Sequence, residues 1–191
     1  MNSAKNRQLL IVVAFILPLL FVIVVLAVSV IPSATLTTGY DFLYATCQDG
    51  SPPYSYYCRP YLDNRLYVDD GALMEREVPP ELDSDRDGIT DVQENYRVRL
   101  FLHDTTLNRS QEIGFDEAAG LQLLDRLTSP DDVAVEWETR GGNDFFFIFG
   151  NDYRAGYYLT RGNARQRLEL INDADRYYYP NGVLFLGWVI P

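Results

Sequence analysis

Residues 83–94 read Asp83-Ser84-Asp85-Arg86-Asp87-Gly88-Ile89-Thr90-Asp91-Val92-Gln93-Glu94, and no other segment of the chain is as informative. Five carboxylates gather here around one basic residue, and the first three alternate, so a curled chain would turn them to the same side. Hard cations such as Ca²⁺ are held by about six to eight oxygen ligands. Gly88 permits the sharp turn that a Cβ atom would obstruct. The segment therefore predicts a cation-binding loop, with a solvated acidic turn as the alternative, since Asp and Gly are ordinary turn residues.

The spacing of these residues resembles the calcium loop of the EF-hand, with acidic residues at loop positions 1, 3, 5, 9 and 12 and glycine at position 6. The resemblance implies Ca²⁺ as the bound ion. It also implies the ligands: Asp83, Asp85, Asp87, the backbone carbonyl of Ile89, Asp91 directly or through a water, and Glu94 with both oxygens. The aliphatic residue stands at position 7, which is more similar to bacterial thrombospondin type 3-like and dockerin-like repeats. Mg²⁺ fits less well, because it prefers a tight six-coordinate shell with several waters.

A degenerate sister loop is predicted over residues 106–117. On the same register, Asn108 falls at position 3 and Glu117 at position 12, but position 1 has no carboxylate and position 6 is Gln111 rather than glycine. We interpret this segment as a non-binding partner hand, with a plain loop before a helix as the alternative. The resemblance to calcium-binding loops then covers residues 83–127.

An apolar segment over residues 9–31 predicts a transmembrane helix. As a helix it would be ~35 Å long, enough to cross a ~30 Å hydrocarbon core. Lys5 and Arg7 precede it, so the positive-inside rule predicts a single-pass protein of the cell membrane with residues 1–8 in the cytoplasm. Residues 33–191 would then lie outside the cytoplasm. A cleaved signal peptide is the alternative, and it places the remainder on the same side.

The remaining pattern predicts an α+β fold. We divide the chain into a cytoplasmic N-terminus 1–8, a transmembrane helix 9–31, a stalk and disulfide-containing β segment 32–82, an EF-hand-like calcium-binding helical segment 83–128, and a β-rich domain with antiparallel hairpins 129–191. Helices are expected at 91–103, 115–127 and 164–171, although the alternation of Leu100 and Leu102 also allows a strand. Strands are expected at 39–46, 65–68, 133–139, 145–149, 153–160, 177–179 and 183–190, with a hairpin turn at 141–144.

Composition narrows the set of partners. The net charge of −11 argues against nucleic acid and suits a chain that meets divalent cations or basic partners. The two cysteines, Cys47 and Cys58, predict one disulfide in an oxidising compartment. A zinc site is a poor alternative, because only His103 could add an imidazole.

Catalytic devices find little support in the sequence. His103, the one histidine, would have to serve any Ser-His-Asp or Cys-His arrangement, and we expect it at the surface or in a loop. A pair of carboxylates for glycoside hydrolysis would come from Glu136 and Glu138 with Asp144 or Asp152, but accidental acidic pairs are common in a chain with 27 acids. We therefore predict a calcium-binding protein, not an enzyme. The calcium would be structural, and the protein would bind a protein or glycan partner at the cell surface or envelope. A small hydrolase with a supportive calcium is the alternative.

Overall fold

The computed structural model describes most of the chain. The described residues are 14, 16–25, 36–48, 59–83, 86, 88–94, 96–138, 156–162, 164–171 and 182–191. Within them the chain is mostly β-structure, and its helices are short.

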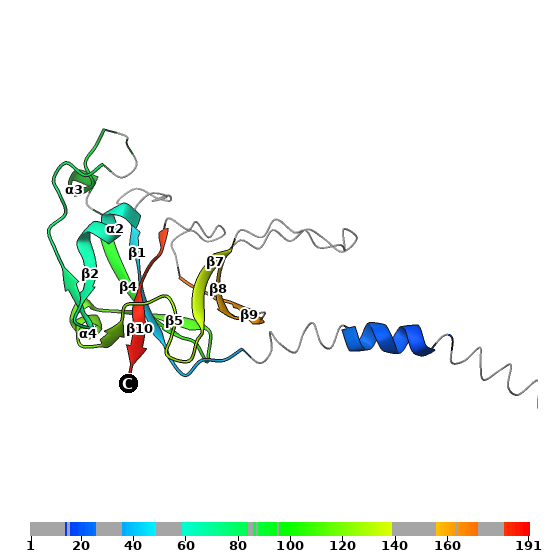
Figure 1. Ribbon diagram of the computed structural model, residues 1–191. Helices are drawn as coiled ribbons and strands as arrows, with labels where there is room; N and C mark the ends of the chain where they lie inside the picture. Colours follow the sequence, from blue (N-terminus) through cyan, green and yellow to red (C-terminus); the bar gives the residue numbers. More distant parts are fainter. Residues whose placement is uncertain are drawn as a thin grey trace, which may run out of the picture.

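A five-stranded antiparallel sheet forms the centre of the molecule (Figure 1). Its order is β5-β4-β1-β10-β6. The bounds of these strands are β1 Phe42–Gln48, β4 Arg97–Asp104, β5 Arg109–Ile113, β6 Gln122–Leu124 and β10 Leu184–Ile190. Successive residues of a strand point to opposite faces, and β1 places apolar side chains on both. The sheet must therefore be covered on both sides.

One face is covered by two helices and a hairpin. These are α2 Arg59–Arg65, the hairpin of β2 Leu66–Asp69 and β3 Ala72–Glu75, and α4 Phe115–Ala119. Leu43 and Ala45 of β1 pack here against Leu62, Leu73 and Ala118, in what we call the first core cluster. Burial of a single leucine side chain contributes roughly 1.5–3 kcal/mol, so this layer fixes the helices on the sheet.

The other face is covered by a three-stranded sheet of β7 Ala134–Glu138, β8 Gly156–Arg161 and β9 Ala164–Arg167. Figure 1 shows these strands on the opposite side of the main sheet from β2 and α4. Phe42, Tyr44 and Trp188 of the main sheet pack here with Val135 and Leu159 in the second core cluster. The Phe42 and Trp188 rings meet edge to face, with centroids 5.5 Å apart. Such pairs contribute ~0.5–1.5 kcal/mol beyond area burial.

The predicted α+β fold with an EF-hand-like helical segment is wrong. A helix does begin at Asp91, but α3 ends at Glu94, and residues 97–104 form the strand β4. The helix predicted over residues 115–127 stops at Gly120, and β6 follows. Residues 97–104 form a strand because their apolar side chains recur every second residue, which matches a pleated chain and not a helix.

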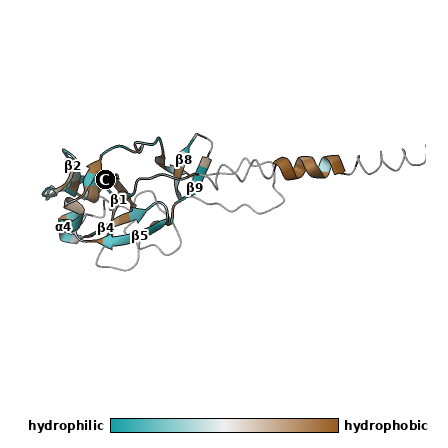
Figure 2. Ribbon diagram, turned by 90° about the horizontal axis from the view of Figure 1, so that it is seen from below, coloured by the Kyte–Doolittle hydropathy of each residue, from teal (hydrophilic) through white to brown (hydrophobic). Residues whose placement is uncertain are grey.

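The prediction of a transmembrane helix over residues 9–31 is also wrong for the part of the chain that the structure describes. There, no helix combines the length and the apolar character that a membrane span requires. The described residues 16–25 are helical and apolar (Figure 2), and at 1.5 Å per residue they rise ~15 Å.

The structure tests the helix predicted over residues 164–171 but not the segments predicted at 141–149 and 177–179. The helix predicted over residues 164–171 is wrong, because residues 164–167 form β9 and pair with β8. The segments predicted at 141–149 and 177–179 lie outside the described residues.

Candidate metal centre

The loop that begins at Asp83 is closed at its base by backbone hydrogen bonds. The Asp91 N–H donates to the Leu82 carbonyl at 2.7 Å, which joins the two ends of the loop. At the start of α3, the Thr90 N–H donates to the Gln93 side-chain oxygen at 3.3 Å, and the Gln93 N–H donates to the Thr90 carbonyl at 2.7 Å. A Gln three residues after the N-cap fixes a helix start in this way.

Asp83 lies inside this loop, and its two carboxylate oxygens differ. Oδ2 accepts a hydrogen bond from the Gly88 N–H at 3.0 Å. Gly88 has a φ of +91°, a conformation that glycine adopts without strain. Oδ1 is buried and has no hydrogen-bond partner among the described residues. A buried polar atom without a partner costs about 1–3 kcal/mol, and more when it is charged.

The other predicted ligands are only partly placed. Asp91 is 0% exposed at the first position of α3, whereas the Ile89 side chain is 47% exposed. Asp85, Asp87 and the Glu94 side chain lie outside the described residues.

The described part of the chain holds no group of three or more His, Cys, Asp or Glu side chains that could bind a metal ion. The calcium-binding group that the sequence predicts is therefore contradicted within the described residues, which leave out Asp85, Asp87 and the side chain of Glu94.

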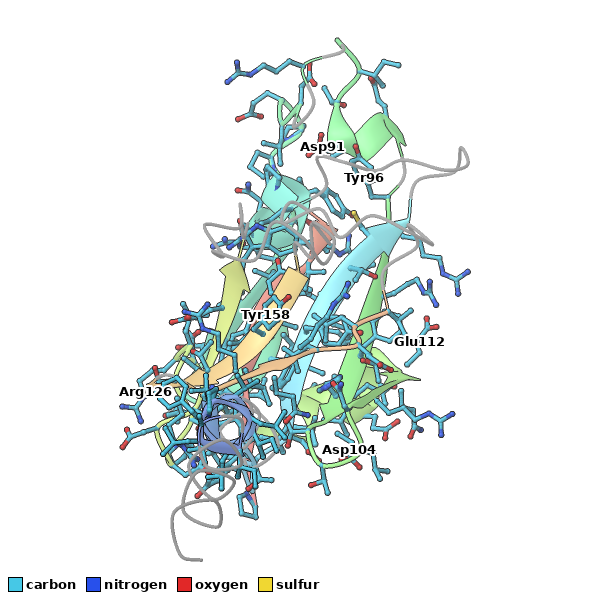
Figure 3. All side chains as sticks on the ribbon, turned by 90° about the vertical axis from the view of Figure 1, so that its right-hand side faces the viewer. Asp91, Tyr96, Asp104, Glu112, Arg126 and Tyr158 are labelled. Atoms are coloured by element: carbon cyan, nitrogen blue, oxygen red, sulfur yellow. The ribbon has the colours of Figure 1, made fainter. Side chains whose placement is uncertain are left out.

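The predicted sister loop does not lie beside the first. Residues 106–117 contain the turn before β5, β5 itself and the first residues of α4. The eight residues of β4 place the start of the predicted sister loop roughly 25 Å from the first loop at ~3.3 Å per residue, and β5 then runs back alongside β4 as far as Leu100. Figure 3 shows Asp91 at one end of the molecule and Asp104 at the other.

A second polar cluster surrounds His103, which sequence reasoning placed at the surface or in a loop. That prediction is wrong, because His103 lies in β4 and is 0% exposed. Its ring stacks on Phe42 with centroids 4.8 Å apart. Nδ1 lies 2.9 Å from Ser110 Oγ, and the Tyr44 hydroxyl also lies 2.9 Å from Ser110 Oγ. The side chain of His103 thus packs against the second core cluster, to which Phe42 belongs.

Burial has a clear electrostatic effect on this ring. It lowers the pKa of His103 below the ordinary value of 6.5. The side chain of Asn108 and the carboxylates of Asp41, Asp104 and Glu169 oppose that change only in part. The imidazole is therefore neutral at pH 7.

The structure describes the side chain of only one member of the acidic set that could serve glycoside hydrolysis. Glu136 is exposed on β7, whereas the Glu138 side chain, Asp144 and Asp152 lie outside the described residues. Cys47 is buried at the end of β1 and disulfide-bonded, and Cys58 lies outside the described residues.

We compared the chain with protein families, curated proteins and solved structures. No protein-family model, no curated protein and no solved structure matches the chain.

Proposed function

We propose that this chain is a non-enzymatic, extracytoplasmic binding protein in which calcium orders the loop over residues 83–94. Asp83 carries the proposal. One of its carboxylate oxygens holds the Gly88 amide, and the other is buried with no partner among the described residues. A divalent cation would give this oxygen a partner and remove the cost of leaving it unpaired.

The ion would assemble its site rather than enter a finished one. Carboxylates at close range repel one another until a cation neutralises them. In this proposal Ca²⁺ draws the remaining ligands toward Asp83 and Asp91: Asp85, Asp87, the Ile89 carbonyl and Glu94. Metal binding then contributes directly to the free energy of folding.

The loop is connected to the first core cluster by an aromatic contact. Tyr96 follows the loop and is buried against Tyr61 of α2, with ring centroids 5.1 Å apart. The Tyr61 hydroxyl donates to the Tyr96 carbonyl at 3.4 Å. An ordered loop would therefore hold the start of β4 against α2, and calcium would stabilise the face that α2 covers.

An extracytoplasmic compartment supports this function in two ways. Calcium is abundant there, and modules of this type bind it with a Kd of ~10⁻⁴–10⁻³ M. Such a compartment also keeps a disulfide at Cys47 oxidised. The net charge of −11 favours a partner with basic groups on a protein or glycan and disfavours nucleic acid.

The test is thermal unfolding of the full chain with 10 mM CaCl₂, with 10 mM MgCl₂ and with chelator. A ligand at about 100 times its Kd stabilises the folded state by ~2.7 kcal/mol. We expect the unfolding temperature to rise in calcium and to rise less in magnesium. Equal unfolding temperatures in calcium and in chelator would refute the proposal.

Asp83→Asn is the decisive variant. It retains an oxygen that can accept from the Gly88 amide but removes the charge that the ion requires. We expect the calcium-dependent rise to disappear in this variant and to persist in Glu81→Gln. Glu81 is a matched control, because it is an exposed acid two residues before the loop.

A hydrolase is the second candidate, and one contact favours it: Ser110 Oγ lies 2.9 Å from His103 Nδ1. A nucleophile and base need this distance. However, His103 is fully buried, and the Tyr44 hydroxyl contacts the same Ser110 oxygen. Substrate could not reach the pair without displacing the residues that cover it. Turnover of ester or peptide substrates that is lost in Ser110→Ala would favour this candidate over the binding function.

A further inference from the structure

The chain crosses the second core cluster as it leaves β9. We call residues 167–171 the latch segment; it consists of the last residue of β9 and the four residues that follow, which form no strand. Leu168 and Leu170 are buried in the second core cluster, whereas Ile171 is partly exposed. The latch segment therefore covers part of the face that β1 and β4 present.

Two side chains hold the backbone of the latch segment, Asn108 from the turn between β4 and β5 and Tyr44 from β1. The Asn108 amide donates to the Arg167 carbonyl at 2.9 Å, and its oxygen accepts from the Glu169 N–H at 3.1 Å. The Tyr44 hydroxyl accepts from the Ile171 N–H at 2.8 Å. Both anchors come from β1 and the β4–β5 hairpin. We therefore expect both sets of hydrogen bonds to form or break at the same time.

His103 lies beneath these anchors. Its Nδ1 contacts Ser110 Oγ, which in turn contacts the Tyr44 hydroxyl. Its Nε2 is buried and makes no hydrogen bond of ordinary geometry within the described part of the chain. A neutral ring tolerates this position, but a protonated ring would place a positive charge and an unpaired N–H in a buried site, which is strongly unfavourable.

We propose that His103 is an acid-sensitive switch that releases the latch segment from β1 and the β4–β5 hairpin when its ring gains a proton. Release gives the ring access to water, because the latch segment is attached through groups that surround the ring. The switch does not depend on calcium at the loop of residues 83–94.

The charged groups around the ring come from three elements. Asp41 precedes β1, Asp104 ends β4, and Glu169 lies in the latch segment itself. All three carboxylates favour the protonated ring, but burial outweighs them, and the pKa of His103 is lowered. The stabilisation of the closed state is therefore complete above pH 6.5 and is lost as the pH falls from 6.5 toward the lowered pKa.

The experiment uses nuclear magnetic resonance on the full chain between pH 7.5 and pH 5. With one histidine in the sequence, a single imidazole signal reports the titration without ambiguity. Hydrogen exchange at the Glu169 and Ile171 amides, corrected for intrinsic rates, reports opening of the latch segment. The Leu123 amide, which donates to the Gly71 carbonyl, serves as the internal control.

We expect exchange at Glu169 and Ile171 to rise by about tenfold for each pH unit below 6.5, until the pH reaches the pKa of the closed state. Exchange at Leu123 should not change over this range. A His103 titration at or above pH 6.5 would overturn the proposal, as would full protection of both latch amides down to pH 5.

Two variants separate the histidine from its neighbours. In His103→Asn, exchange at the latch amides should no longer depend on pH. In Glu169→Gln, the dependence should persist, and its loss would mean that the carboxylate and not the ring is the sensor. If His103→Asn does not fold, the imidazole titration of the unmodified protein and the Glu169→Gln exchange data still decide the question.

Discussion

The turn at Gly71 offers a sharp test of how the layers are joined. Asp70 and Gly71, with φ values of 48° and 78°, form the two-residue turn between β2 and β3. Two left-handed residues in sequence are typical of the type I′ hairpin turn. The Gly71 carbonyl accepts from the Leu123 N–H at 2.7 Å, so the turn also attaches the hairpin to β6 of the main sheet.

The change Gly71→Ala introduces two separate costs. A Cβ atom at this φ costs ~1–2 kcal/mol of backbone strain. The new atom would also overlap Gln122 Nε2 and lie 2.9 Å from Gln122 Cδ and 3.2 Å from the Leu123 carbonyl oxygen. The Gln122 side chain is exposed and can move, but the Leu123 carbonyl belongs to β6, and such crowding costs ~1–3 kcal/mol. We expect a total loss of about 2–5 kcal/mol.

Urea unfolding would measure this loss, and two further variants divide it. Gly162→Ala carries only the backbone cost, because Gly162 has a φ of 58° and a Cβ there would meet no atom within 4 Å. It should lose ~1–2 kcal/mol. In a Gln122→Ala background, Gly71→Ala should lose ~1 kcal/mol less than alone. If Gly71→Ala costs no more than Gly162→Ala, the turn does not pack against β6 as we describe.

Three other perturbations probe the rest of the core. Leu62→Ala, at a fully buried position of α2, should lose ~2–5 kcal/mol in urea unfolding, and a smaller loss than ~1 kcal/mol would contradict its place in the first core cluster. Burial raises the pKa of Tyr157 to about 12, so stability should fall as the pH rises from 10 toward 12, and Tyr157→Phe should remove part of this dependence in alkaline unfolding. Burial alone would raise the pKa of Asp131. The hydrogen bonds that Ser129 and Thr38 donate to its carboxylate outweigh this effect and lower the pKa below 3.8. Stability should therefore decline as the pH falls below 3.8, and Asp131→Asn should decline less in acid unfolding.

The strands that can be read from the sequence are those whose side chains alternate. Val133, Val135 and Trp137 share one face, and β7 lies at this place over residues 134–138. Residues 184–190 likewise form β10. The strands that pair with β10 cannot be predicted from its sequence. β10 pairs with β1 and β6, which are both distant from it in the chain. Pairing over such a distance depends on how the layers close, and no local pattern records it.

The helix predicted over residues 91–103 shows how a motif can override a better signal. The calcium-loop pattern predicts a helix that runs on from Asp91, whereas the alternation of Val98, Leu100 and Leu102 is typical of a strand, and the strand β4 forms there. The Asp70-Gly71 pair was a second readable signal, since Asp-Gly between apolar residues is typical of a hairpin turn. Gly120, likewise, is an ordinary residue for the end of a helix.

The candidate sites differ in how far the sequence discloses them. Asp83 and Asp91 can be proposed from the sequence because a calcium loop is a local pattern of residue types. The burial of His103 cannot be read locally, because a single histidine has no pattern of its own and the sheet of β7–β9 that covers this face comes from distant sequence. One signal for its burial is its position two residues after Phe101 on β4, since alternate residues of a strand share a face.

The two sites we propose act on opposite ends of one strand. The loop of residues 83–94 precedes β4, and His103 lies at the other end of it, roughly 25 Å away. Charges this far apart are largely screened at physiological ionic strength, where the Debye length is ~8 Å. The covering layers also differ, because Tyr96 packs in the first core cluster and His103 stacks on Phe42 of the second. Calcium at one end and a proton at the other would therefore control separate faces of the same sheet.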